Sequence, residues 1–296
     1  MSHASDATTR RKDSVIAGAR PLRPFVLVLA LGVSVGLSCA ANFVLFGSEF
    51  LRASTAWSGE LVNGTLVANL VLIAVVVAGV LVGVGGARAP ELGLRARTLL
   101  PALGGTLAAW GVLNVLALGA VVAAGAPIEW SGVVAADGAA LPLLGEVLGQ
   151  LFGNALYEEL LFRGVLLTQC ALLFAARGRG GLVLALVVSQ AIFALQHVPN
   201  RVAFDQWADP AGAALDLLAL FVSGLCFSGV FLRTRNLLLA VGLHTLVNVP
   251  CLFVSGPQWV HPAGMALVLL VAMLLGPRLV PARTSSASPP AGVLTT

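Results

Sequence analysis

Two adjacent carboxylates and an arginine stand inside a long apolar stretch, in the sequence EELLFR at positions 158–163. An ionisable group at the centre of a bilayer costs at least about 2.5 kcal/mol, so each one there is a candidate for function. Glu159 and Arg163 are four residues apart on one helical face and can form an ion pair. Glu158 projects about 100° away from Glu159 and keeps no cation of its own, which suits a general base. A buried ion-pair network that only holds helices together is the alternative.

Two further polar clusters lie in later apolar segments: FALQH at positions 193–197 and HTLVN at positions 244–248. Taken alone, His197 is an inert histidine at a helix end. His244 and Asn248 share a helical face, and alone they are an interhelical hydrogen-bonding pair. Together with the two glutamates, these groups supply what hydrolysis of an amide bond needs. A base activates water, a partner orients that base, and donors hold the oxyanion.

Other polar residues within the apolar segments receive a structural interpretation. We expect packing hydrogen bonds from four amides, Asn42, Asn69, Asn114 and Gln190. Glu146 and Asp216 fall near the outer ends of their segments, where water reaches them, and we do not expect either to be catalytic.

The composition is that of a membrane protein. The chain has 296 residues, of which 58% are hydrophobic and 10% are charged, and its mean hydropathy is +0.96. A soluble domain carries about 25% charged residues. This excludes a water-soluble globule, and with it intrinsic disorder and a nucleic-acid-binding protein. The four cysteines match no metal motif and no disulfide framework.

Eight apolar segments come near the roughly 20 residues that a helix needs to cross a bilayer. We therefore expect an all-α polytopic membrane bundle of about eight transmembrane helices. The fourth segment is too long for a perpendicular crossing, so it should be tilted, or broken near Gly149 or Gly153. The expected segments are 24–46, 61–84, 99–124, 143–175, 181–197, 211–232, 236–254 and 262–280.

Basic residues alternate between the two sides of this arrangement. With a cytoplasmic N-terminus, fourteen basic residues fall inside and only Arg52 and Arg201 fall outside, while Arg163 lies within a span. This positive-inside asymmetry places both termini in the cytoplasm. The single lysine and the abundance of Ala, Gly and Val hint at a GC-rich bacterial genome. We therefore expect a multi-pass protein of the bacterial inner, or plasma, membrane.

The chain divides into five parts. Residues 1–20 and 281–296 are polar, and we expect a disordered cytoplasmic tail and a disordered C-terminal tail. Residues 21–139 form the N-terminal transmembrane helices, 140–255 the core with the polar clusters, and 256–280 the last transmembrane helix. One difficulty concerns depth, because His197 lies near the outer end of its span whereas His244 lies in the middle of another. The helices must tilt for both to reach one site.

The three motifs, EExxxR, FxxxH and HxxxN on successive apolar helices, resemble those of the CPBP family of intramembrane proteases. This family includes the type II CAAX prenyl endoproteases and bacterial proteins linked to bacteriocin self-protection, often called the Abi family. The resemblance covers about residues 140–255, and the sequence ELGLR at 91–95 also resembles a loop of the family. It implies a membrane-embedded endopeptidase that cuts a peptide bond near the membrane.

The resemblance also implies roles for single residues. Glu158 would activate water, assisted by His197, and Glu159 with Arg163 would orient and charge-balance Glu158. The oxyanion-stabilising pair would be His244 and Asn248. Phe193 would pack the site and contact the substrate.

A metal-free reaction is the expectation, and zinc held by Glu158, His197 and His244 is the alternative. The expected partners are a peptide or membrane-protein substrate and the lipid bilayer. The oligomeric state is left open. A non-enzymatic scaffold or immunity protein on the same fold remains an alternative. A proton-coupled transporter is another, although the internal repeats typical of transporters are missing from the sequence.

Overall fold

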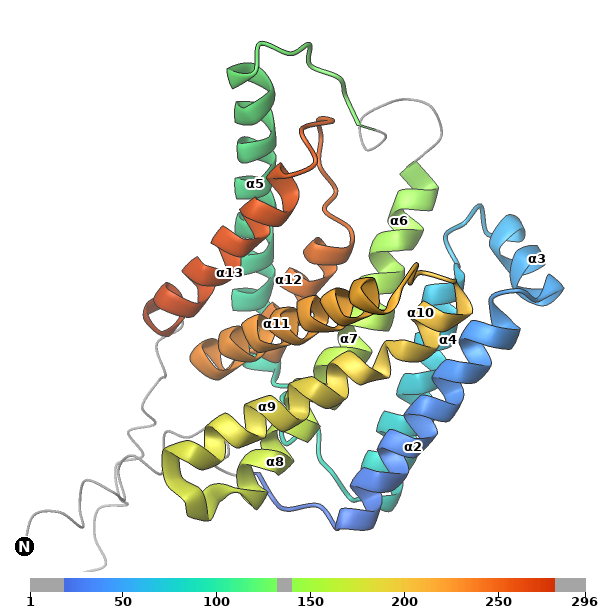
Figure 1. Cartoon of the computed structure of the whole chain (residues 1–296), viewed down its shortest axis with the longest axis vertical. Coiled ribbons are helices and arrows are strands. Elements are labelled where there is room, and N and C mark those ends of the chain that lie inside the picture. Colours follow the sequence, from blue (N-terminus) through green and yellow to red (C-terminus); the bar gives the residue numbers. More distant parts are fainter. Residues whose placement is uncertain (1–18, 132–139, 280–296) are drawn as a thin grey trace, which may run out of the picture.

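The computed structural model describes residues 19–131 and 140–279. The predicted N-terminal tail at 1–20 lies outside these residues except for its last two positions, and the predicted C-terminal tail at 281–296 lies wholly outside them. Within the described residues the chain is all-α and contains no β-strand, as the sequence predicts. Two short extended segments meet at an isolated bridge between Trp130 and Val254. Figure 1 shows the helices gathered into one bundle.

The N-terminal half contributes three long helical segments. Helix α2 (Pro24–Ala40) runs on through η1 (Ala41–Leu45), and α4 (Gly64–Leu72) runs on through η2 (Ile73–Val84). A short helix, α3 (Glu49–Trp57), links these two. The third segment is η3 (Ala96–Thr98) with α5 (Leu99–Ala123).

The fourth apolar segment is continuous and carries wide helical turns. It comprises α6 (Ala140–Gly149), η4 (Gln150–Asn154), α7 (Ala155–Glu158), η5 (Glu159–Leu167) and α8 (Thr168–Leu173). Of the two alternatives for this segment, a tilt or a break near Gly149 or Gly153, the break is not present. Instead the π-helical turn η4 starts directly after Gly149. Such turns insert an extra residue and are frequent at functional sites.

The C-terminal half contains η6 (Ala175–Arg177), α9 (Gly178–Gln196), α10 (Val198–Ala203), α11 (Pro210–Thr234), α12 (Leu237–Asn248) and α13 (Val260–Leu279). The fifth apolar segment is longer than expected, since helix continues from Ala175 to Ala203. Helices α9 and α11 run across the other helices rather than beside them (Figure 1).

The expected span at 236–254 is too long, because the helix in this seventh segment is α12 (Leu237–Asn248). Asn236 caps α12 by accepting a hydrogen bond from the Leu239 amide, and its own side chain donates to the Thr98 carbonyl. The helix then ends at Asn248, because Pro250 disfavours helical backbone at the residue before it. Twelve residues of helix span about 18 Å, which is less than a hydrocarbon core.

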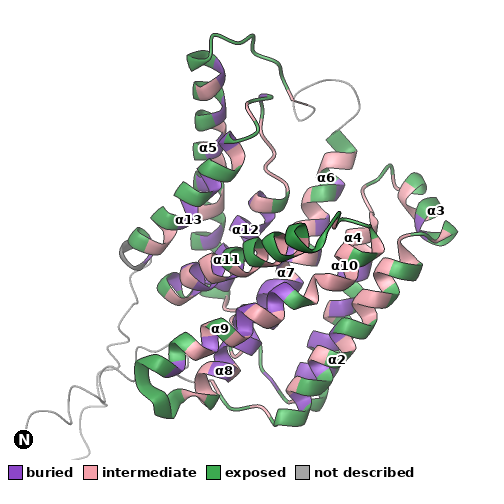
Figure 2. Ribbon diagram, viewed as in Figure 1, coloured by how far each residue is buried: buried purple, intermediate pink, exposed green. Residues whose placement is uncertain are grey.

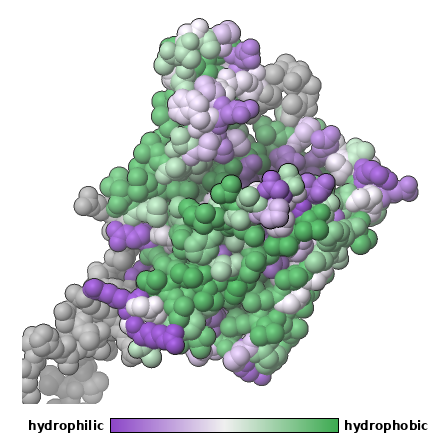
Figure 3. Space-filling view, viewed as in Figure 1, coloured by the Kyte–Doolittle hydropathy of each residue, from purple (hydrophilic) through white to green (hydrophobic). Residues whose placement is uncertain are grey.

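Five helices in the described residues are long and apolar enough to cross a membrane, namely Pro24–Leu45, Gly64–Val84, Ala96–Ala123, Ala175–Ala203 and Pro210–Thr234. All eight expected segments contain helix. Many large apolar side chains on the outer surfaces are exposed, as lipid-facing residues are. Apolar atoms cover most of the face in Figure 3, while buried residues concentrate at the centre of the bundle in Figure 2. The protein is therefore a multi-pass membrane protein.

Two apolar clusters hold the bundle together around its centre. One packs α2, η2 and α9 against η5, with Phe162 and Leu161 fully buried. The other packs α5, α11 and α13 against α12, around Leu113 and Leu243. The first cluster includes residues of η5, and the second includes residues of α12. These two helices carry two of the three polar motifs, so both motifs are held by the packing of the bundle's centre.

Candidate active site

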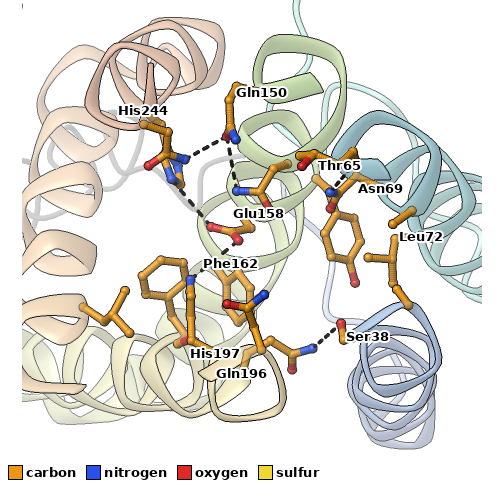
Figure 4. A pocket seen from close by; sticks show the side chains of 18 of the residues that line it. Ser38, Thr65, Asn69, Leu72, Gln150, Glu158, Phe162, Gln196, His197 and His244 are labelled. Atoms are coloured by element: carbon orange, nitrogen blue, oxygen red, sulfur yellow. Dashed lines mark hydrogen bonds and ion pairs between the residues drawn. The ribbon is translucent and has the colours of Figure 1, made fainter. Parts of the chain in front are cut away.

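Glu158 lies at the centre of the site, at the last residue of α7. Its two carboxylate oxygens face different imidazoles. The Oε1 atom is 3.7 Å from Nε2 of His197, and the Oε2 atom is 3.6 Å from Nε2 of His244. The side chain of Glu158 is 12% exposed, so the carboxylate is sheltered but reachable from the cavity. Figure 4 shows both contacts, with Glu158 between the two rings.

Both imidazoles are held by hydrogen bonds at their other nitrogen. Nδ1 of His197 is 2.9 Å from the Phe193 carbonyl oxygen, and Nδ1 of His244 is 2.8 Å from Oε1 of Glu159. Because carbonyl and carboxylate oxygens accept, Nδ1 carries the hydrogen in both rings. The two Nε2 atoms therefore face Glu158 in defined orientations.

The predicted ion pair between Glu159 and Arg163 is confirmed. Nη1 of Arg163 is 3.1 Å from Oε1 of Glu159, and both side chains are fully buried. The guanidinium lies over the Phe193 ring, 4.3 Å from its centroid, and its Nη2 donates to the Gly224 carbonyl on α11. Arg163 thus compensates the charge of Glu159, while Oε2 of Glu158 has no hydrogen-bond partner among the described residues.

Two phenylalanines frame the histidines. The Phe193 ring meets His197 edge to face, with centroids 4.8 Å apart. Phe227 on α11 stacks on His244 with centroids 4.6 Å apart and an angle of 18° between the planes. No spacing in the sequence marks Phe227, because it contacts His244 through tertiary packing between α11 and α12.

Asn248 is the last residue of α12 and is exposed to the cavity. Its Nδ2 atom donates to Oε1 of Gln150 at 2.8 Å. Sequence reasoning did not identify Gln150. In a regular α-helix Gln150 and Glu158 lie about 80° apart around the axis. The π-helical turn η4 adds one residue, so eight residues make about two turns and both side chains reach the cavity.

A cavity of about 360 Å³ joins these groups. The residues expected to be catalytic at Glu158, His197, His244 and Asn248 line it, as does Phe193, whereas Glu159 and Arg163 lie behind Glu158. Its remaining wall is rich in carboxamides, which come from Asn42, Asn69, Gln150, Asn154, Gln196 and Asn200. Figure 4 shows several of these side chains on the side of the cavity opposite His244.

The other polar residues fall partly where the sequence suggested. Asn114 makes packing hydrogen bonds to the Trp110 carbonyl and the Phe253 amide. Asn42 also makes packing bonds, but it lines the cavity together with Asn69, which was not expected. Glu146 lies within hydrogen-bonding distance of Asn63, outside the cavity.

The difficulty of depth is resolved by the shape of two elements. Since α12 is short, His244 lies one turn from its C-terminal end. Helix α9 runs across the bundle (Figure 1), and His197, directly after its last residue, lies 3.7 Å from Glu158. Both histidines therefore reach the same carboxylate.

The loop ELGLR at 91–95 supports the helix that carries the glutamates. Leu92 is buried, and its carbonyl packs directly on Gly164, where any side chain would collide with it. The next residue, Gly93, has φ of 85° and packs on Leu237, a turn that favours glycine.

The zinc alternative names Glu158, His197 and His244 as the ligands. Glu158 lies between the two histidines, and each of its oxygens faces one ring. In the described part of the chain, no group of three or more His, Cys, Asp or Glu side chains is arranged to hold a metal ion. The reaction proposed below uses protein groups alone, and zinc held by Glu158, His197 and His244 remains its alternative.

One comparison with known proteins identifies the segment that contains the site. Residues 140–250 match the protein-family model described as type II CAAX prenyl endopeptidase Rce1-like. No curated protein and no solved structure matches the chain. All seven residues singled out from the sequence motifs lie within the matched segment.

Proposed function

We propose that this chain, whose residues 140–250 belong to the Rce1-like family of type II CAAX prenyl endopeptidases, hydrolyses an internal peptide bond by means of Glu158. The family is a protease family, and here its segment forms the centre of a multi-pass membrane bundle. The observation that carries the proposal is one sheltered carboxylate facing two oriented imidazoles in a cavity. This is the arrangement that general-base activation of water requires.

The proposed reaction assigns one task to each group. Glu158, assisted by His197, takes a proton from water while the water oxygen bonds to the carbonyl carbon of the substrate. The carbonyl oxygen becomes an oxyanion, and Asn248 donates a hydrogen bond to it, as does His244 when its Nε2 carries a proton in addition to Nδ1. The carbon–nitrogen bond then breaks, and Glu158 returns the proton to the leaving amine nitrogen. Glu159 and Arg163 touch no substrate and act as positioning residues, Glu159 through Nδ1 of His244.

The charges around the cavity favour a bond inside the substrate chain. Glu158 is the one carboxylate in the cavity lining formed by the described residues, and Arg201 is the one arginine. Arg201 is already paired with Asp216 at 2.8 Å. A substrate's terminal carboxylate would therefore meet Glu158 with no free arginine or lysine to bind it, which disfavours a carboxypeptidase.

The test is peptide cleavage by the purified full-length protein in detergent, with a library of quenched fluorescent peptides. We expect Glu158→Gln to lower kcat by about 100-fold or more, because positioned proton transfer contributes about 10² to 10⁴. His197→Ala should also lose activity. Glu146→Gln is the matched control, since Glu146 lies on the same helical segment outside the cavity, and it should cleave as the wild type does.

Two further measurements separate the metal-free protease from a zinc enzyme and from a non-enzymatic protein. Activity that survives a chelator supports the metal-free reaction, whereas loss that zinc reverses would assign Glu158 and the histidines to a metal. A cellular phenotype that survives Glu158→Gln at unchanged membrane abundance would contradict the enzyme and favour a scaffold or immunity protein.

A further inference from the structure

The two ends of the bundle differ sharply in charge. Contacts between the loops identify one end. Arg20 pairs with Glu91, Arg23 donates to the Val84 carbonyl, and Asn236 donates to the Thr98 carbonyl. We call this the arginine-rich end, because it carries Arg20, Arg23, Arg88, Arg95, Arg97, Arg177, Arg179, Arg233 and Arg235, with Glu91 as its acidic residue. It includes the start of α2 and the turn between α8 and α9 at the lower edge of Figure 1.

Contacts also join the loops at the opposite end. Phe46 packs against Phe204 with centroids 6.0 Å apart, and the Ser131 amide donates to the Phe253 carbonyl. We call this the acidic end, because its described loops and short helices hold Glu49, Glu60, Glu129, Asp205 and Asp209. Its arginines are Arg52 and Arg201, and Asp216 already neutralises the second.

The cavity lies towards the acidic end. On the first span, Pro24–Leu45, the residues that line the cavity begin at Ser38, towards the C-terminal end of the helix. On the second span, Gly64–Val84, they end at Leu72, in the N-terminal half of the helix. The same holds for α9–α10, which line the cavity from Phe193 to Arg201, and for α12, which does so from His244 to Asn248. Each of these portions adjoins a loop of the acidic end.

The route from the acidic end to Glu158 is polar. Asn200 on α10 donates to Asn42 on η1 at 2.9 Å, and Gln196 on α9 donates to Ser34 on α2 at 2.8 Å, so these helical segments meet through amides and hydroxyls. Ser223 on α11 lines the cavity and is exposed. A wall of this kind admits water and pairs with an extended peptide backbone, which offers both donors and acceptors.

Short loops rich in arginine stay in the cytoplasm. We propose that the catalytic cavity opens on the extracytoplasmic face of the membrane, and that its substrate is an extended peptide segment presented from that face. The statement about substrate rests on the function proposed above, whereas the statement about the opening rests on the charges and the cavity alone.

The opening is tested with single thiols in the full-length protein, after the four free cysteines are replaced by alanine. Ser223→Cys reports on the cavity, Trp57→Cys on the acidic end and Arg179→Cys on the arginine-rich end. A charged methanethiosulfonate reagent that cannot cross membranes is added to intact spheroplasts and to opened ones. We expect the first two thiols to react fully in intact spheroplasts and Arg179→Cys to react only after opening.

Labelling of Arg179→Cys in intact spheroplasts, with Trp57→Cys protected, would overturn the proposed orientation. Labelling of Trp57→Cys without Ser223→Cys would overturn the proposed opening of the cavity.

The substrate side is tested with a peptide that the purified wild type cleaves. Intact spheroplasts should cleave it in the medium, and those that express Glu158→Gln should not. Cleavage only after opening would overturn the proposed side while the protease function stands. If the purified protein cleaves no peptide, the proposed function fails, and the thiol labelling still decides the opening.

Discussion

At the scale of single residues, the pair of Glu159 and Arg163 is the part of the site that tolerates least change. Both side chains are fully buried, and each has further contacts that depend on the other's charge. Glu159 holds His244 at Nδ1, and Arg163 reaches the Gly224 carbonyl. A buried pair of this kind need not add stability, but removal of one partner leaves an uncompensated charge.

Arg163→Met should therefore lower the free energy of unfolding by about 3–5 kcal/mol. The double variant Glu159→Gln with Arg163→Met should recover most of that loss, because neither member of the pair is then left as an uncompensated buried charge. Thermal unfolding in one detergent measures both. A double variant no more stable than Arg163→Met would contradict the assignment of the loss to the charge of Glu159.

At the scale of elements, the segment from α6 to α8 depends on a loop far away in the sequence. The Leu92 carbonyl packs on Gly164, the residue after Arg163, so the loop at 91–95 fixes the depth of η5 in the bundle. Any side chain at this glycine would push the loop and the glutamates apart.

Gly164→Ala should lower stability by about 1–3 kcal/mol, as overpacking of a well-filled site does. Gly104→Ala is the matched control, because nothing lies within 4 Å of a side chain there and the position is inside helix α5. The control should be unchanged, or more stable by up to about 1 kcal/mol, since alanine favours helix over glycine. Equal melting temperatures for the two variants would mean that the Leu92 backbone moves away from residue 164 with little loss of stability.

The elements also explain what the sequence could and could not predict. Apolar runs predicted all eight helical segments, and helical spacing predicted the pair of Glu159 and Arg163. Gln150 escaped because the π-helical turn η4 shifts the spacing. The early end of α12 escaped because the residues after Asn248 are as apolar as a helix would be. Phe227 escaped because its contact with His244 joins two helices.

At the scale of the whole molecule, the chain entering α2 is fastened to the loop before α5. Arg20 donates to Oε1 of Glu91 at 2.6 Å and to Oε2 at 3.1 Å, and the Arg88 amide donates to the same carboxylate. Gln169 on α8 adds a bond to the Leu22 amide. The contacts among Arg20, Arg88 and Glu91 lie outside the membrane-spanning helices, and together with the bond from Gln169 they join three parts of the arginine-rich end.

The hydrogen bond from Arg20 lowers the pKa of Glu91 below its ordinary value. A carboxylate with a lowered pKa in the folded state adds stability above its unfolded pKa of about 4.3, and this stability is lost as pH falls through the lowered value. We therefore expect Glu91→Gln to lower the melting temperature at pH 7 and to make little difference at an acidic pH below the lowered pKa of Glu91. Glu49→Gln, at a highly exposed carboxylate, should match the wild type at both pH values. If the melting temperatures of Glu91→Gln and the wild type differed by the same amount at both pH values, the proposed role of the ionised carboxylate would be wrong.

The early end of α12 has a further consequence for the chain that follows it. Backbone groups that a longer helix would have paired need other partners once the helix ends. The Trp110 indole donates to the Cys251 carbonyl, Asn114 accepts from the Phe253 amide, and the Ser255 amide donates to the Glu129 carbonyl. Side chains of α5 and a carbonyl of a neighbouring loop thus make the hydrogen bonds that a longer α12 would have made within itself. Trp110 and Asn114, two residues of α5 remote from Glu158, thus provide partners for backbone groups that follow the end of α12 at Asn248.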